Sequence, residues 1–153
     1  MLPLRSRVAG LVALGLTCAS PAIAQSDDAT AVRAVVEAFA AHAQAKALDG
    51  LDTLVAHDSW VYIIEGAGVN HGWTEYRDHH LAPELAEFEN FSYRYFAIEP
   101  QVRGAVAWTP FRYELSADTP RGHVEVEGRG TAVLEQRDGR WVIVHLHTSG
   151  RRR

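Results

Sequence analysis

The chain has 153 residues, a formal net charge of −4 and a single cysteine, Cys18. This length fits one domain with a hydrophobic core of its own. One thiol cannot supply a disulfide framework, and the acidic excess argues against nucleic acid as a partner.

The first 24 residues have the order of a secretory signal peptide. Arg5 and Arg7 precede an apolar run over residues 8–16, and the small residues Ala22 and Ala24 stand before the polar segment that follows. We therefore predict cleavage after Ala24, a periplasmic or secreted location, and a mature domain over residues 25–153 with a net charge of −6. The apolar run is too short for a permanent membrane helix, and no later stretch is long enough, so no stable membrane insertion is expected.

The mature chain begins with its clearest helical pattern. Over residues 28–47 the apolar positions recur at spacings of three and four, namely Val32, Val35, Val36, Phe39, Ala40 and Ala43. Gly50 is expected to break this helix, and residues 51–56 to add a short helical turn. A β-rich run over 60–64 predicts a strand, and the glycine-rich segment 66–70 predicts a loop.

The second half alternates one helical segment with long strand-like runs. Residues 73–88 have helical spacing, with Pro83 expected to kink or split the helix. Strands are predicted over residues 91–98, 105–116, 123–136 and 141–149, joined by turns at 100–104, 117–122 and 137–140. Helices first and hairpin-linked strands last indicate an α+β fold, with a largely antiparallel sheet and helices on one face.

The last hairpin carries a family resemblance. The run Arg137-Asp138-Gly139-Arg140-Trp141-Val142-Ile143-Val144-His145-Leu146-His147-Thr148-Ser149-Gly150 resembles the closing hairpin of the calcium/calmodulin-dependent kinase association domain and its bacterial relatives. Weaker support comes from Gly72 to Arg77 and from Phe111-Arg112-Tyr113. The chain is thus similar to SnoaL-like members of the nuclear transport factor 2-like superfamily.

The resemblance implies a cone-shaped, strongly curved, cystatin-like sheet with about three helices, usually in a homodimer. Isomerases, polyketide cyclases and epoxide hydrolases share this superfamily with many members of no known activity, so the fold does not give the function. Two arginines of the kinase domain's carboxylate pocket fall here on Ala132 and Thr148, whereas a third matches Arg112.

Arg112 is therefore the main candidate for a ligand contact. We expect it to project into the cone beside Trp108 and to receive a carboxylate, unless Glu114 or Glu99 pairs with it internally. Further candidate ligand-binding residues come from the helix over 73–88 and from its surroundings: Tyr76, His80, His71, Arg77 and Tyr62. For Arg77 an internal ion pair is the preferred interpretation.

Histidines and one glutamate are the candidates for chemistry. His145 and His147 share one strand face and could form half of a metal site, although no third ligand can be chosen among Glu65, His71, His79 and His80. Structural histidines are the preferred interpretation, and no metal or other cofactor is expected. Glu65 is the best acid candidate, with a surface position as its alternative.

Three hypotheses for function follow. The first is an exported small-molecule-binding domain with a conical pocket for an apolar or carboxylate-bearing ligand. The second is an isomerase, cyclase or hydrolase with His71 or His80 as base and Arg112 as electrostatic stabiliser. The third is an assembly module without a ligand. An open cone in which His80 and Arg112 converge favours the first two, and a cone filled by side chains favours the third.

Overall fold

The computed structural model describes residues 21–153, with side chains from residue 27 on. Most of the predicted signal peptide, including Cys18, lies outside the described residues, so processing and export stay predictions. In the described part of the chain, no helix combines the length and the apolar character that a membrane span requires.

The first helix, α1 (Pro21–Gln44), buries the predicted apolar stripe. It ends before Lys46, which adopts a left-handed conformation at φ 55°, and not at Gly50 as expected. Gly50 instead lies inside the short helix α2 (Leu48–Asp52), where the ring of His42 occupies the space that a side chain would need. The predicted turn over 51–56 thus begins three residues early.

A second helical run covers the segment after the first β-hairpin. It consists of α3 (Trp73–Tyr76), a π-helical segment η1 (Arg77–Leu81) and α4 (Ala82–Glu87). Pro83, in the first turn of α4, cannot donate a backbone hydrogen bond, and the wider π-helical turn directly before it accommodates this loss. The predicted interruption at Pro83 is confirmed.

Seven strands form one sheet in the order β2-β1-β7-β6-β5-β3, with β4 also paired to β5. Their bounds are β1 Tyr62–Glu65, β2 Gly68–His71, β3 Glu89–Phe96, β4 Gln101–Arg103, β5 Val106–Thr119, β6 Gly122–Arg137 and β7 Arg140–Arg152. β1 runs parallel to β7 and all other pairs are antiparallel. The loop predicted at 66–70 and the turn predicted at 100–104 are wrong in part, because β2 and β4 gain hydrogen bonds from neighbouring strands.

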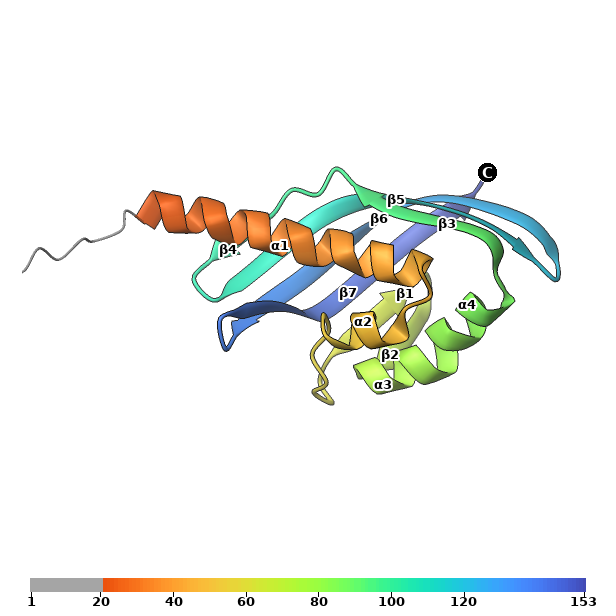
Figure 1. Cartoon of the computed structure of the whole chain (residues 1–153), viewed down its shortest axis with the longest axis horizontal. Helices are drawn as coiled ribbons and strands as arrows, with labels where there is room; N and C mark the ends of the chain where they lie inside the picture. The colour runs from red at the N-terminus through yellow and green to blue at the C-terminus, as the bar shows by residue number, and fades with distance from the viewer. Residues whose placement is uncertain (1–20) are drawn as a thin grey trace, which may run out of the picture.

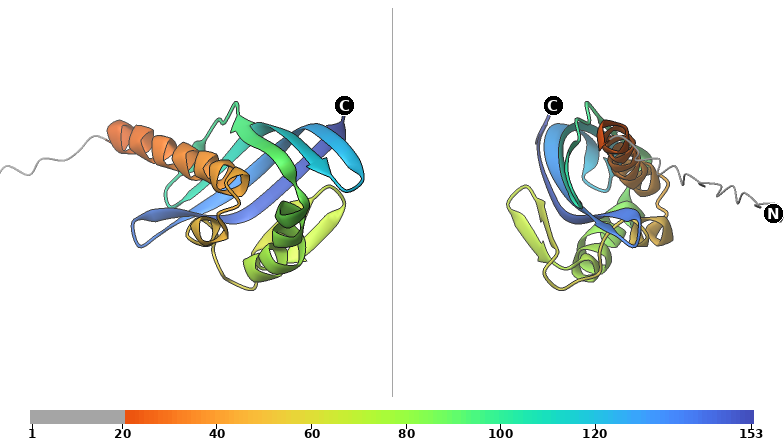
Figure 2. Two further views of the ribbon diagram at one scale, coloured as in Figure 1. Left: turned by 45° about the vertical axis from the view of Figure 1, so that its right-hand side comes forward. Right: turned by 90° about the vertical axis from the view of Figure 1, so that its left-hand side faces the viewer.

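The helices lie on one side of a curved sheet, which confirms the predicted α+β class. Figure 1 shows α1 lying across the sheet and the α3–α4 run beside β1 and β2, and Figure 2 shows the strands curling around the side that the helices cover. We call this side the inner face. On β5 it carries Ala107, Thr109, Phe111 and Tyr113, which are all buried.

The register of the last hairpin decides where the two strand histidines point. A two-residue turn at Asp138-Gly139 pairs Arg137 with Arg140, but a bulge at Val133/Leu134 then shifts the register by one residue. His145 therefore lies opposite Val133 and His147 opposite Thr131, on the outer face of the sheet. The turn lies at the predicted residues 137–140, and the bulge beyond it selects the face, which the sequence leaves open.

Candidate functional site

A carboxylate and a phenol meet at the end of β1, on the inner face of the sheet. Glu65 pairs with Thr148 of β7, which places its side chain on the inner face. The hydroxyl of Tyr76, a residue only 5% exposed, donates a hydrogen bond of 3.1 Å to Oε2 of Glu65. Because the Glu65 side chain is 37% exposed, the carboxylate remains accessible from solvent. Glu65 is therefore partly at the surface, as its alternative interpretation expects, but it also contacts a buried phenol.

An imidazole from the π-helical segment joins this pair. Nε2 of His80 lies 3.5 Å from Oε2 of Glu65 and 3.7 Å from Oε1 of Glu84, which follows one turn later on α4. The ring of His80 also packs on the ring of Tyr76, with 5.1 Å between centroids. The predicted pairing of Tyr76 with His80 is thus present, and it includes Glu65.

Asn70 of β2 indicates which nitrogen of His80 carries the proton. Its Nδ2 lies 3.3 Å from the backbone oxygen of Ile63 and 3.5 Å from Nδ1 of His80. Since the Ile63 carbonyl can only accept, the amide presents its donor side, and Nδ1 of neutral His80 is the acceptor. The proton then resides on Nε2, directed toward Glu65 and Glu84.

The same three side chains form the one group of possible metal ligands found among the described residues. The nearest donor atoms of Glu65, His80 and Glu84 all lie within 4.8 Å of one another. A metal at Nε2, however, requires that nitrogen to be unprotonated, and the orientation of Asn70 disfavours the tautomer in which Nδ1 carries the proton. The three side chains are therefore better suited to share the proton on Nε2 of His80 than to bind a metal ion.

Four tyrosines lie within the electrostatic influence of Glu65 and keep their protons at ordinary pH. Burial, followed by the negative charge of Glu65, raises the pKa of Tyr76 and of Tyr113. Burial likewise raises the pKa of Tyr93 and of Tyr95, and Glu65 adds to both shifts. These phenols therefore act as neutral hydrogen-bond donors.

The carboxyl of Glu84 is affected in the same direction. Partial desolvation and the charge of Glu65 together raise its pKa above the usual value, although His80 partly opposes them. Two carboxylates this close resist being ionised together, so the cluster has a tendency to retain a proton.

The floor next to this cluster is aromatic. The hydroxyls of Tyr93 and Tyr95 share a hydrogen bond of 2.8 Å, and the ring of Tyr95 stacks on Phe111 with 4.2 Å between centroids. Gly130 lies opposite Phe111 and Gly128 opposite Tyr113, and a β-carbon on either glycine would overlap the facing ring. The two glycines thus allow the rings to lie flat on the sheet.

Arg112 and Trp108 do not lie in the cone, contrary to expectation. Both occupy positions on β5 that alternate with the buried Phe111 and Tyr113, so they project from the outer face. Arg112 forms an ion pair of 3.1 Å with Glu127, and neither Glu114 nor Glu99 is its partner. His80 and Arg112 consequently lie on opposite faces of the sheet and do not converge.

The other candidate residues also lie away from the cluster. His71 and Tyr62 are cross-strand neighbours on the outer face, with 4.8 Å between ring centroids. Arg77 forms a 2.8 Å ion pair with Asp52, which confirms the preferred internal interpretation. His145 is half-buried on the outer face, where desolvation lowers its pKa, and with His147 it joins no group of metal ligands in the described part of the chain.

Several members of the cluster were not identified from the sequence. The composition around Asn70 predicts a loop, and the pattern around Tyr93 and Tyr95 predicts only a strand. Two signals were present: the spacing of four between His80 and Glu84 on one helix face, and the spacing of two between the tyrosines on one strand face.

Comparisons with known proteins agree on the fold. Residues 32–151 match the family model of the SnoaL-like domain. A comparison with curated proteins gave no match. A nuclear transport factor 2-like superfamily protein from Salmonella enterica serovar Typhimurium has a TM-score of 0.76 at 18% identity, covering 82% of this chain and 92% of its own.

Two further solved structures are similar. A "putative ketosteroid isomerase" from Shewanella frigidimarina is 26% identical with a TM-score of 0.66, covering 75% of this chain and 91% of its own. An uncharacterised protein with a cystatin-like fold from Caulobacter vibrioides is 18% identical with a TM-score of 0.67, covering 84% of this chain and 90% of its own. Together with the matches above, these likenesses confirm the fold that the last hairpin indicated.

Proposed function

Because the chain belongs to the SnoaL-like domain family, whose model matches residues 32–151, we propose that it is an exported protein that binds a small molecule on the inner face of its sheet. The observation that carries this proposal is the cluster of Glu65, Tyr76 and His80. The partly exposed side chains of Glu65 and His80 meet the buried hydroxyl of Tyr76 there, beside an aromatic floor. A few directed polar groups among apolar ones are the composition of a ligand site.

The chemistry of the cluster defines the class of ligand. Glu65 and Glu84 make this end of the inner face acidic, which disfavours a carboxylate-bearing ligand there. The mutual hydrogen bond of Tyr93 and Tyr95 uses one of their two hydroxyl protons, which leaves one for a ligand acceptor. The proposed ligand is therefore a neutral, largely apolar molecule with one hydroxyl or carbonyl group.

A pair of probes tests this assignment. 2-Naphthol and naphthalene share an aromatic body, but only the naphthol has a hydroxyl that can donate to Glu65. We expect fluorescence titration to give saturable binding of both, with 2-naphthol about tenfold tighter, the range for a hydrogen bond to a charged acceptor. Glu65→Gln should remove most of this preference.

The matched control is Glu37→Gln, which removes one acidic charge from an exposed position on α1, away from the cluster. It should leave both affinities unchanged. Failure of either probe to bind the wild-type protein, or an unchanged preference in Glu65→Gln, contradicts the proposed site.

An enzyme of the isomerase type is the second candidate. Glu65 replaces His71 or His80 as the base, because its partly exposed carboxylate lies on the inner face, whereas His71 lies on the outer face and Nε2 of neutral His80 carries a proton. The similar Shewanella protein bears an isomerase name. In such a reaction, Glu65 removes a proton from a carbon next to a carbonyl, and a phenol donates a hydrogen bond to the enolate oxygen. Exchange of the α-protons of 2-tetralone in D₂O, followed by NMR, should then fall about 100-fold in Glu65→Gln. Binding without exchange supports the first candidate alone.

A further inference from the structure

The outer face of the sheet divides into an apolar half and a charged half. Cross-strand register places Trp108 beside Val133 and His145, and Tyr62 continues this row on β1. Four residues further along β5, a second cross-strand row begins with Arg112 and continues with Arg129 and Ser149. The outer face of β5 thus changes from an aromatic to a charged residue over four residues, which are two steps along one face of the strand.

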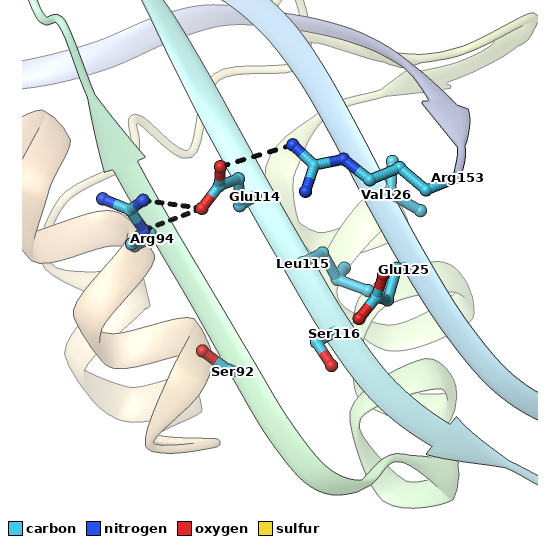
Figure 3. A pocket seen from close by; sticks show the side chains of 8 residues that line it. All are labelled: Ser92, Arg94, Glu114, Leu115, Ser116, Glu125, Val126 and Arg153. Atoms are coloured by element: carbon cyan, nitrogen blue, oxygen red, sulfur yellow. Dashed lines mark hydrogen bonds and ion pairs between the residues drawn. The ribbon is translucent and has the colours of Figure 1, made fainter.

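Most of the charged half is internally neutralised by a ladder of ion pairs. Arg94 pairs with Glu114 at 2.6 Å and Arg153 lies 3.7 Å from the same carboxylate. Figure 3 shows these three side chains reaching across the edge of a small hollow of about 140 Å³. Glu127 continues the ladder, since Arg153 and Arg112 both pair with it. Each acid of the ladder is thus already shared by two arginines.

Arg129 and Arg151 stand outside this ladder. Arg129 lies directly opposite Arg112 on the neighbouring strand, and Arg151 lies opposite the already shared Glu127. Among the described residues, neither side chain has a hydrogen bond or ion pair, although the charge of Arg151 acts on Glu127, and both side chains are exposed. Like charges directly opposite each other in a sheet are destabilising, and of the two facing arginines only Arg112 pairs with Glu127, so Arg129 is the arginine that needs a counter-charge.

A hollow of about 900 Å³ lies over these residues. Arg112, Arg129 and Arg151 line it from three adjacent strands, together with Ser149, and the backbone at Gly128 and Gly150 contributes to its floor. Glu127 and Glu99 also line it, but Glu127 is engaged by two arginines. In a chain with a net charge of −4, this is a local surplus of guanidinium groups around an open space.

We propose that this hollow binds an oxyanion, a carboxylate or phosphate group of a small molecule, between Arg129 and Arg151. The planar guanidinium fork matches two oxygens of either group, and the Ser149 hydroxyl, opposite Arg129 in the register, supplies a further donor. An acidic ligand at this place relieves the Arg112–Arg129 repulsion. The site lies on the face opposite to the proposed small-molecule site and is independent of it.

Calorimetric titration with citrate and with inorganic phosphate at low ionic strength tests the proposal. We expect at least one of them to bind the wild-type protein with a dissociation constant of about 1 mM or below, and Arg129→Gln to weaken that binding about tenfold. The two titrants distinguish the sources of the oxyanion, since citrate offers planar carboxylates and phosphate a tetrahedral group.

The control is Arg121→Gln, which removes the same charge from an exposed position in the β5–β6 turn. It should bind either anion as the wild type does. Absence of binding by both anions overturns the proposal, and so does an equal loss in the two variants, because attraction to net charge alone then explains the binding.

Discussion

Asp52 connects the helical layer through its two carboxylate oxygens. It accepts a hydrogen bond of 2.6 Å from the indole of Trp73 and bonds of 2.8 and 2.9 Å from Arg77. Burial acts to raise the pKa of Asp52, but these donors outweigh it and hold the pKa below its usual value. The ionised form of Asp52 therefore stabilises the fold and positions the helix that carries Tyr76 and His80.

Asp52→Asn should lower the thermal midpoint on the order of 3 °C at pH 7, because the charge on Arg77 loses one of its two acidic partners and keeps only the exposed Asp78. A depressed folded-state pKa contributes stability above the unfolded-state value, about 3.9, and loses it as pH falls through the folded-state value. The difference between wild type and variant should thus shrink below about pH 4.

Thermal melts over this pH range provide the measurement. Asp49→Asn, an exposed change on the same short helix, serves as the control and should leave the midpoint unchanged. A difference between wild type and Asp52→Asn that persists at low pH would count against the role of the ionised carboxylate.

At the scale of elements, the aromatic floor depends on glycines in β6. The ring of Phe111 occupies the space next to Gly130, where a β-carbon would also lie 2.7 Å from the backbone oxygen of His147. A backbone contact of this kind cannot be relieved by a change of rotamer. The strand pair β5–β6 therefore combines a large ring with a glycine at each of two successive inner positions, 111 with 130 and 113 with 128.

Gly130→Ala should therefore cost about 1 to 3 kcal/mol of unfolding free energy, the range for overpacking a filled core. It should also weaken 2-naphthol binding, because Phe111 must tilt away from Tyr95. Urea unfolding and the fluorescence titration measure the two effects. Thr131→Ala, on the exposed face of the same strand, should change neither, and a Gly130→Ala protein of wild-type stability would refute the close packing.

At the scale of the whole molecule, the apolar half of the outer face is unusually open to solvent. Tyr62, Val69, Val106 and Trp108 are 40% to 50% exposed there, and Trp60, just before β1, is 48% exposed. Large apolar groups gathered on one face mark an interaction surface. We propose that a second copy of the chain covers it, which retains the homodimer that the sequence analysis expected.

Native mass spectrometry of the exported protein tests the dimer and the processing together. We expect a dimer of chains that begin at Gln25, stable at about 10 µM, whereas Trp108→Glu should give monomers by placing a charge in the contact. Thr74→Glu, an equal change on the exposed side of α3, should remain dimeric. A wild-type monomer contradicts the interface, and a chain that retains Met1 or starts at Cys18 contradicts the processing site.

The sequence alone determined the class, the helical stripe of α1, the interruption at Pro83 and the four long strands, because each depends on a local period or on the chemistry of proline. It also identified Tyr76 and His80 as neighbours, since a spacing of four on a helix fixes them in space. Glu65 was recognised only as the best acid in its strand.

The tertiary structure decided which face each strand turns inward. On β5 both sets of alternating residues contain aromatic rings, Trp108 on one side and Phe111 and Tyr113 on the other, so the pattern alone did not identify the buried side. The helices cover the face of Phe111 and Tyr113, and Arg112 is therefore directed outward. A single bulge in the β6–β7 pair likewise directs His145 and His147 to the outer face. Side chains alternate between the two faces of a strand with a period of two residues, so the sequence pattern alone leaves the faces equivalent. Only packing against another element makes one of them the buried face.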